Sequence, residues 1–126
     1  MKKIIRTLEA PAPIGPYNQA VLIGNTLYTS GQIALHPESG ELILDDIKTE
    51  TRQVMENMKA VLAAAHMTFD HVVKTSIFIS DMNDFAAINE VYGEYFNDDT
   101  APARETVQVA KLPKNVNVEI SMIAMV

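Results

Sequence analysis

Residues 101–109 read Ala-Pro-Ala-Arg-Glu-Thr-Val-Gln-Val, and this stretch decides how the rest of the 126-residue chain is interpreted. Pro102 favours extended backbone at the residue before it. The alternation that follows predicts a strand over about 103–109, with Arg104, Thr106 and Gln108 on one face. A guanidinium at the start of a strand can hold a carboxylate through a planar fork of donors. The alternative is an arginine paired with Glu105 or another surface carboxylate.

Length and composition predict one globular domain spanning residues 1–126. A net charge of −6 argues against broad binding of a phosphate backbone, so we expect no nucleic-acid partner. No stretch approaches the roughly 18 apolar residues of a membrane span, and the N-terminal residues lead into no signal-peptide core. We therefore expect a cytoplasmic protein with no membrane partner.

Metal, thiol and cofactor chemistry have no support in the sequence. The chain contains no cysteine, which excludes a thiolate nucleophile and cysteine metal ligands. Its three histidines, His36, His66 and His71, lack the spacing of metal ligands. The motifs of phosphate-binding loops and of serine hydrolases are also absent. We expect neither a metal nor a cofactor.

The first half of the chain predicts a loop, a hairpin and a helix. Three prolines and a glycine within residues 10–16 exclude helix and central strand, and this loop delivers Tyr17 and Asn18 to its end. Two β-rich runs, 20–23 and 26–30, flank Gly24-Asn25 and predict a hairpin. From about Ile47 to Ala65, apolar residues recur at helical spacing.

The second half predicts a strand, a shorter helix and two further strands. Residues 72–79 are β-branched and alternating. Asp81 or Asn83 is expected to cap a second helix, whose apolar stripe is Phe85, Ile88, Tyr92 and Tyr95 or Phe96. Strands follow at about 103–109 and 116–125. The order β-β-(β)-α-β-α-β-β predicts an α+β fold with two helices on one face of a sheet.

The last strand carries the second candidate residue, Glu119. Val116, Val118 and the alternate residues after them form one apolar face, and the other face, which includes Glu119, turns apolar toward its end. Two helices cannot cover both faces, so we expect association with another copy of the chain. If the last two strands formed a hairpin, Glu119 would lie near Thr106 on the face of Arg104. Residues 110–115 carry no tight-turn signature, however, so a longer crossover is equally open.

Each polar candidate also has a structural interpretation. A mid-strand carboxylate such as Glu119 is either functional or paired with a basic side chain, because an unpaired buried charge is costly. Tyr17 and Ser30, both at the ends of elements, could be ordinary surface side chains.

Seven blocks, taken in order along nearly the whole chain, resemble the reactive intermediate deaminase (Rid, or YjgF-like) family, and the match is closest to its archetypal deaminase branch. The blocks are Ile14-Gly15-Pro16-Tyr17-Asn18-Gln19-Ala20, Tyr28-Thr29-Ser30-Gly31-Gln32-Ile33, Thr51-Arg52-Gln53-Val54-Met55-Glu56-Asn57, Asp81-Met82-Asn83-Asp84-Phe85, Asn89-Glu90-Val91-Tyr92, Ala101-Pro102-Ala103-Arg104 and Val118-Glu119-Ile120. Each block alone is weak evidence, whereas the ordered set is specific.

The resemblance implies a chorismate-mutase-like fold, a homotrimer with clefts between subunits, and cofactor-independent hydrolysis of 2-imino acids and their enamine tautomers to 2-oxo acids and ammonia. By motif, Arg104 corresponds to the arginine that holds the substrate carboxylate and Glu119 to the glutamate that positions or activates water. Residues expected to line the same cleft are Tyr17, Ser30, Gly31, Asn89 and Thr106.

Two positions depart from the commonest family pattern. Thr106 stands where many members carry cysteine, so the chemistry of this chain cannot depend on a thiol. Asn18 stands where many members carry serine. A second function class is a trimeric module that binds small carboxylates without turnover. A nuclease or translation-inhibitor activity, claimed for some relatives, is disfavoured by the net charge of −6 and by the absence of an aromatic and basic stripe.

Overall fold

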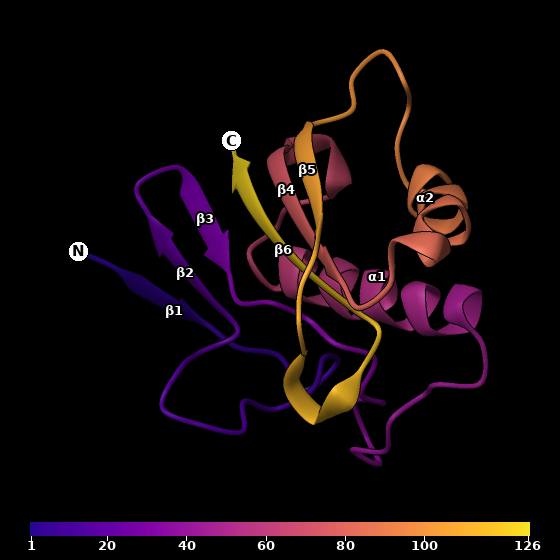
Figure 1. The fold of residues 1–126 in the computed structure, drawn as a ribbon. Coiled ribbons are helices and arrows are strands. Elements are labelled where there is room, and N and C mark those ends of the chain that lie inside the picture. Colours follow the sequence, from indigo (N-terminus) through magenta and orange to yellow (C-terminus); the bar gives the residue numbers. More distant parts are fainter.

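The computed structural model describes residues 1–126 as a six-stranded sheet with two α-helices on one face (Figure 1). The strands lie in the order β1-β2-β3-β6-β4-β5. Their bounds are β1 Lys3–Ile5, β2 Ala20–Ile23, β3 Thr26–Thr29, β4 Val72–Ile79, β5 Ala103–Gln108 and β6 Val118–Met125; the helices are α1 Ile47–Ala64 and α2 Phe85–Gly93. The predicted α+β class is therefore confirmed, and so are the hairpin, the two helices and the last three strands, to within about two residues at most ends. The bracketed strand between the hairpin and the first helix is absent, and β1 is not among the predicted elements.

The last two strands do not form a hairpin. β5 pairs in parallel with β4, while β6 pairs antiparallel with β4 on its other side, so β4 lies between them. The chain passes from β5 to β6 through a short 3-10 helix at Pro113–Asn115. The longer crossover is therefore the correct alternative, since the connection must travel around the end of β4.

This topology puts Arg104 and Glu119 on opposite faces of the sheet. Arg104 is level with Thr75 of β4, whereas Glu119 is level with Phe78. Successive residues of a strand point to opposite faces, so Thr75 and Phe78, three positions apart, face opposite ways. Thr75 is buried against the helices, which places the Arg104 face on the helix side. A hairpin of the last two strands would have put Glu119 on the same face as Arg104, and that alternative is wrong.

The two helices begin differently. At α1, the Asp46 side chain accepts a hydrogen bond from the backbone N–H of Thr49 (2.7 Å), which satisfies one of the free donors of the first turn. Asp81 caps the short 3-10 helix Met82–Asp84 that precedes α2, and no side chain caps α2 itself. Because α2 ends at Gly93, Tyr95 and Phe96 lie beyond it, although both pack against the core.

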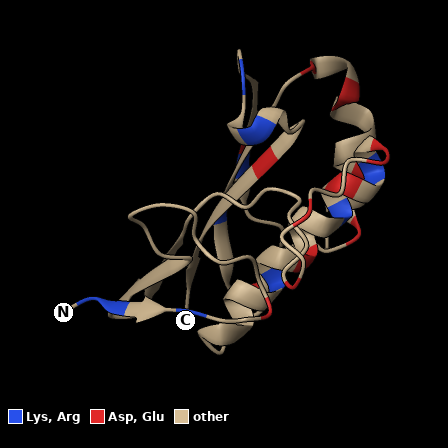
Figure 2. Ribbon diagram, turned by 90° about the horizontal axis from the view of Figure 1, so that it is seen from below, with Lys and Arg blue, Asp and Glu red and all other residues tan.

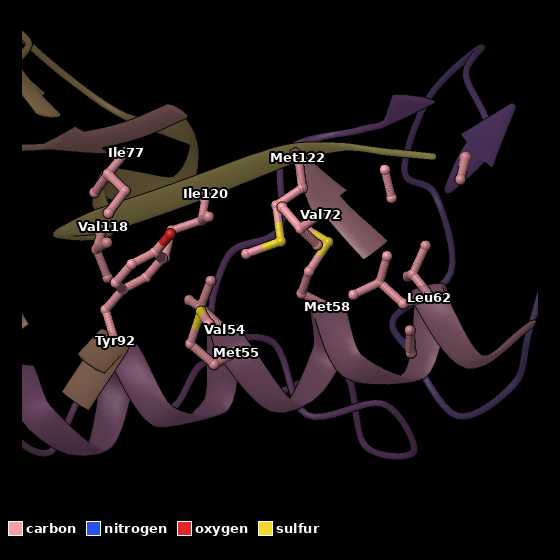
Figure 3. Packing of buried hydrophobic residues seen from close by; sticks show 14 of the residues in the cluster. Val54, Met55, Met58, Leu62, Val72, Ile77, Tyr92, Val118, Ile120 and Met122 are labelled. Carbon is pink, nitrogen blue, oxygen red and sulfur yellow. The ribbon is translucent and has the colours of Figure 1, made fainter. Parts of the chain in front are cut away.

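The main core lies between α1 and the sheet. Figure 3 shows Val54, Met55, Met58 and Leu62 of α1 pointing toward β6, where the alternate residues Val118, Ile120 and Met122 point back at them. All of these side chains are buried. Burial of each contributes about 1.5–3 kcal/mol, so this contact fixes the position of β6, and with it Glu119.

The opposite face of the sheet is covered only in part. A smaller cluster, Ile33, Leu35, Leu112 and Val116, packs near Phe78 at one end. Elsewhere on this face Ile23, Tyr28, Val107 and Met125 remain exposed, each with 41–50% of its surface accessible. We call these four residues the open apolar face. It is the partly apolar, uncovered surface that the alternation of the last strand predicts.

Charged residues of both signs are spread over the chain. Figure 2 shows Lys and Arg interspersed with Asp and Glu rather than gathered on one surface. Lys48 pairs with Glu90, and Arg52 pairs with Glu94 (3.0 Å), so two ion pairs join α1 to α2 and its end. No helix has both the length and the apolar character that a membrane span requires.

Candidate functional site

The residues expected at the site fall into two groups. Glu119, Gly31, Ser30 and Tyr17 line one pocket of about 420 Å³. Asn89, Arg104 and Thr106 lie together between α2 and β5, on the other face of the sheet. We call these groups the glutamate pocket and the arginine edge. Within one chain the structure brings together the members of each group but does not join the two groups.

The glutamate pocket is built from three loops and one strand. The proline-rich loop contributes Pro11–Ile14 and Tyr17, the segment after β3 contributes residues 30–33 and Leu35, the crossover contributes Pro113, and β6 contributes Glu119. Its lining combines these apolar side chains with a few polar groups, as small-molecule sites usually do. The carboxyl group of Glu119 is the acidic group in that lining.

Glu119 lies directly against the backbone of Gly31. A Cβ atom placed on Gly31 would come within 2.0 Å of Glu119 Oε2, far closer than any real contact. Only glycine therefore leaves room for the carboxyl group in this position. Partial burial raises the pKa of the Glu119 carboxyl above its ordinary value of 4.5, because the charged form loses hydration. Glu119 forms no ion pair, so its interpretation as the partner of a basic side chain is wrong for this chain.

The walls of the pocket are held by buried amide side chains. Gln19, 3% exposed, accepts a hydrogen bond from the backbone N–H of Thr7 (2.7 Å) and donates to the carbonyls of Ala10 and Pro11 (3.2 and 2.8 Å). Asn57 of α1 donates to the carbonyls of Ile33 and Leu35 (3.1 and 2.9 Å). These bonds give the irregular segments a defined shape without regular secondary structure.

The hydroxyl groups of Ser30 and Tyr17 differ in how strongly they are hydrogen-bonded within the chain. Ser30 Oγ donates to the carbonyl of Asn18 (2.5 Å), so its proton is already engaged and the oxygen is left as an acceptor. Tyr17 is 47% exposed and its hydroxyl accepts only a long bond from the backbone N–H of Ile14 (3.4 Å). Tyr17 thus presents a phenol at the pocket wall, where Ser30 plays a more structural part.

At the arginine edge, α2 supports the guanidinium of Arg104. Arg104 Nη1 donates to Asn89 Oδ1 (2.8 Å), and its Cζ lies over the rings of Tyr92 and Phe85, 5.0 and 5.8 Å from their centroids. Cation–π attraction of this kind stabilises the group while leaving the edge of the fork open. Tyr92 is itself fixed, since its hydroxyl donates to the buried Thr75 (3.0 Å). Burial raises the pKa of Tyr92, which keeps that donor protonated.

Arg104 has no carboxylate partner within the chain. Glu105, the partner considered from sequence, instead binds Lys74 (2.8 Å) and accepts a hydrogen bond from Ser76 on the other face of the sheet. The paired-arginine interpretation is therefore wrong. Thr106, two residues along β5 on the Arg104 face, has a buried hydroxyl oxygen with no hydrogen-bond partner. The arginine edge thus holds two polar groups whose bonding capacity is unused.

The sequence analysis does not predict the aromatic support of Arg104. It predicts Phe85 and Tyr92 as part of the apolar stripe of the second helix, yet with Asn89 they follow the spacing i, i+4, i+7, which gathers residues on one face of a helix. That spacing was the available signal. Pro113 and the amide clamps of Gln19 and Asn57 were also missed, because their partners are loops whose paths depend on the tertiary fold.

Comparison with known proteins agrees with this architecture. The family model described as Endoribonuclease L-PSP matches residues 7–126. A RutC family protein of Pyrococcus horikoshii is 52% identical over 98% of both chains. TdcF of Escherichia coli strain K12, named as a candidate reactive intermediate deaminase, is 48% identical over 98% of this chain and 97% of its own.

Solved structures of similar proteins share the whole fold. The crystal structure of YyfA from Yersinia pestis, described as a Rid family protein of unknown function, superposes with a TM-score of 0.96 at 47% identity and covers 100% of both chains. The structure of E. coli TdcF with bound serine gives a TM-score of 0.92 at 46% identity over 98% of both chains.

The fold and the glutamate pocket define a small α+β protein of a class in which one relative binds an amino acid. This chain belongs to the Rid (YjgF-like, Endoribonuclease L-PSP) family. The family resemblance carried by the seven sequence blocks is confirmed.

Proposed function

We propose that this protein is a cytoplasmic deaminase that hydrolyses 2-imino acids and their enamine tautomers, such as 2-iminobutanoate and 2-iminopropanoate, to 2-oxo acids and ammonia. The observation that carries the proposal is a complementary pair of unpaired groups: the desolvated Glu119 carboxyl in a pocket and an Arg104 guanidinium without a carboxylate partner. An imino acid has a carboxylate that can bind Arg104. It also has an electrophilic carbon that a water molecule beside Glu119 can attack.

Arg104 binds and orients the substrate. Its fork donates hydrogen bonds to the substrate carboxylate, and the rings of Tyr92 and Phe85 keep the guanidinium in place. Fixing the carboxylate also fixes the adjacent carbon–nitrogen bond, which is a proximity effect. Asn89 holds one guanidinium nitrogen, and Thr106 lies two residues along β5 on the same face.

Glu119 moves the protons. It accepts a proton from water as the water oxygen bonds to the imine carbon and the electron pair of the C=N double bond moves to nitrogen. It then returns that proton to the nitrogen, which gives a carbinolamine. The hydroxyl proton of the carbinolamine next passes through the same carboxyl group to the nitrogen as the C–N bond breaks, so that ammonia leaves and the C=O bond forms. An enamine substrate first becomes the imine by gaining a proton on its β-carbon and losing one from its nitrogen. A pKa raised by burial suits this exchange, since a group that both takes and returns a proton works best near the operating pH.

We further propose that the site is completed between copies of the chain in a homotrimer. Arg104 and Glu119 face opposite sides of one sheet, so one substrate can meet both only if they come from different chains. The open apolar face offers a surface for such contact, because apolar patches of this kind commonly mark interfaces. Each cleft would then combine the glutamate pocket of one copy with the arginine edge of its neighbour.

A coupled assay tests the activity. A threonine dehydratase generates 2-iminobutanoate in the presence of semicarbazide, and the semicarbazone is recorded with wild type, Arg104→Ala, Glu119→Gln and no added protein. Wild type should suppress trapping at catalytic concentrations, and both variants should fail to do so. Unchanged trapping at every concentration of wild type would exclude the deaminase.

Mixing the two inactive variants tests the shared site. If Arg104 and Glu119 act from neighbouring chains, random 1:1 mixing of Arg104→Ala and Glu119→Gln subunits leaves about one quarter of the clefts intact, with the same share of wild-type activity. Native mass spectrometry verifies that mixed oligomers formed. Mixed oligomers no more active than their parents would mean that both residues act from one chain.

A second candidate is a module that binds small carboxylates without turnover, and the serine bound to TdcF favours it. Arg104 would serve both functions, so Glu119→Gln separates them: a binder keeps its affinity for 2-oxobutanoate, measured by calorimetry, whereas a deaminase loses turnover. We do not propose cleavage of RNA, because the chain carries a net charge of −6 and its basic residues are dispersed (Figure 2).

A further inference from the structure

A fully buried carboxyl group lies beneath the start of β6. Glu50, in the first turn of α1, has no exposed surface. Its Oε2 accepts hydrogen bonds from the backbone N–H groups of Asn117 (2.7 Å) and Val118 (3.2 Å), and its Oε1 accepts one from Asn117 Nδ2 (2.8 Å). No Lys, Arg or His forms an ion pair with it. All the hydrogen bonds of its side chain therefore go to the two residues that precede Glu119.

These bonds take the place of a neighbouring strand. N–H groups of alternate residues in a strand point to the same side. On that side of β6, Ile120 exchanges hydrogen bonds with Gln32, at 2.8 and 3.1 Å. Two residues earlier, where the segment after β3 no longer reaches, the N–H of Val118 meets Glu50 instead. Glu50 thus extends the hydrogen-bonded edge of β6 by one step, through a side chain from a helix.

Glu119 is consequently held from both directions. On its amino-terminal side, Asn117 is fixed by Glu50 and also by Ser80, whose N–H donates to the Asn117 carbonyl (3.0 Å). On its other side, the Ile120–Gln32 bridge holds β6 against the segment that contains Gly31. The carboxyl group of Glu119 has no hydrogen bond of its own within the chain, so its place against Gly31 depends on where the backbone puts it.

We propose that Glu50 is a positioning residue for Glu119. By accepting hydrogen bonds from the N–H groups of Asn117 and Val118, it fixes the start of β6 in the position that places the Glu119 carboxyl against Gly31. Glu50 never touches the substrate. Its role in catalysis rests on the proposed deaminase function, but its role in placing Glu119 does not.

The geometry distinguishes two substitutions. Glu50→Gln retains an oxygen that can accept from both backbone N–H groups, and its amide can donate to Asn117 if the Asn117 side chain turns over. Glu50→Ala leaves two buried N–H groups without an acceptor, which costs more than the loss of the bonds themselves. The glutamine variant should therefore restore what the alanine variant loses. Leu62→Ala, a buried core residue of the same helix without contact to Asn117, is the control for general loss of stability.

The decisive measurement is the titration of the Glu119 carboxyl by ¹³C NMR, with the signal assigned from the Glu119→Gln variant. In wild type the midpoint should lie above 4.5. Glu50→Ala should lower it by about half a unit or more, since a displaced carboxyl regains water. Glu50→Gln and Leu62→Ala should keep the wild-type midpoint, even where Leu62→Ala lowers Tm as much as Glu50→Ala does.

Turnover provides the second readout. With 2-iminobutanoate, Glu50→Ala should lower kcat about 10- to 100-fold with little change in KM, because Arg104 is untouched. A wild-type midpoint in folded Glu50→Ala, or an equal shift in Leu62→Ala, would overturn the positioning role. If wild type has no activity, the proposed function fails, and the titration still decides the role of Glu50.

Discussion

Glu119 and Arg104 are both charged side chains on strands, yet the chain holds them by opposite means. Glu119 is placed by backbone: Gly31 makes room for it, and the β6 main chain is fixed on either side of it. Arg104 is placed by side chains: the amide of Asn89 and the rings of Tyr92 and Phe85. The arginine side chain is longer than that of glutamate and has one more torsion to restrict, and its contacts hold it along its length.

The difference shows which substitutions each half of the site can tolerate. The glutamate pocket depends on the absence of a side chain at Gly31, so even a methyl group disturbs it. At the arginine edge several contacts together hold the guanidinium of Arg104, so the remaining contacts should partly compensate for the loss of one. The following predictions test this contrast, starting from the largest effect.

Glu119→Gln should lower kcat for 2-iminobutanoate about 10²- to 10⁴-fold, because the amide cannot take a proton from water. KM should change little, since the substrate carboxylate binds elsewhere. Steady-state kinetics by the semicarbazide assay gives both constants. A variant that kept its kcat while KM rose would show that Glu119 binds substrate and does not transfer protons.

Arg104→Lys should lower kcat/KM about 10- to 100-fold, because the ammonium keeps the charge but loses the fork and its stacking on Tyr92. The loss should lie mainly in KM. Arg104→Ala, which removes the charge as well, should be worse. Equal kinetics for the lysine variant and wild type would mean that a point charge suffices and that the aromatic support is irrelevant.

Gly31→Ala should lower kcat about 10- to 100-fold, since the new methyl group occupies the place of Glu119 Oε2. Gly93→Ala is the matched control: a Cβ added at Gly93 would meet no atom within 4 Å, and alanine suits the end of α2 better than glycine does. Crystal structures of both variants would reveal whether the Glu119 carboxyl moves only in the first. Full activity of Gly31→Ala would contradict the close contact.

Tyr92→Leu should lower kcat/KM about 3- to 10-fold through loss of the cation–π contact with Arg104. Tyr92→Phe keeps the ring and should retain near wild-type kinetics, while its lost hydrogen bond to Thr75 lowers Tm by about 3–6 °C. Kinetics and calorimetry on the pair separate support of Arg104 from support of the core. Equal kinetics for the two variants would remove Tyr92 from the site.

Glu119→Gln should also raise Tm slightly, by about 1–2 °C at pH 7. Burial raises the pKa of Glu119, so the charged form destabilises the folded chain above that pKa, and this penalty disappears as the pH falls through it toward the ordinary value of 4.5. The difference in Tm between variant and wild type should therefore shrink between neutral pH and about pH 4. A difference that grew on acidification would mean that a cation stabilises the carboxylate.

The sequence predicts the elements well because their signals are local. The Gly24-Asn25 turn, the stripe of α1 and the alternation of β4 each depend on near neighbours, and the observed bounds agree with them. Family motifs also picked out Arg104 and Glu119. What local signals could not supply is strand order: whether β5 pairs with β6 or with β4 depends on long-range packing, and that choice decides which face each residue occupies.

Support residues were hidden for the same reason. Tyr92 has the spacing of a core residue, and it is one, but its ring is shared between the core and Arg104. Glu50 is an acidic residue in the first turn of a helix, a place where such residues usually complement the helix dipole at the surface. Only the fold shows that it turns inward to β6.

Because Arg104 and Glu119 lie on opposite sides of a single sheet, the activity of the protein should depend on its concentration. If each cleft needs two chains, an isolated chain is folded but has no catalytic activity. Specific activity would then fall on dilution below the assembly threshold, and the open apolar face would set that threshold. The proposed deaminase activity would then rise more steeply than in proportion to the number of chains made.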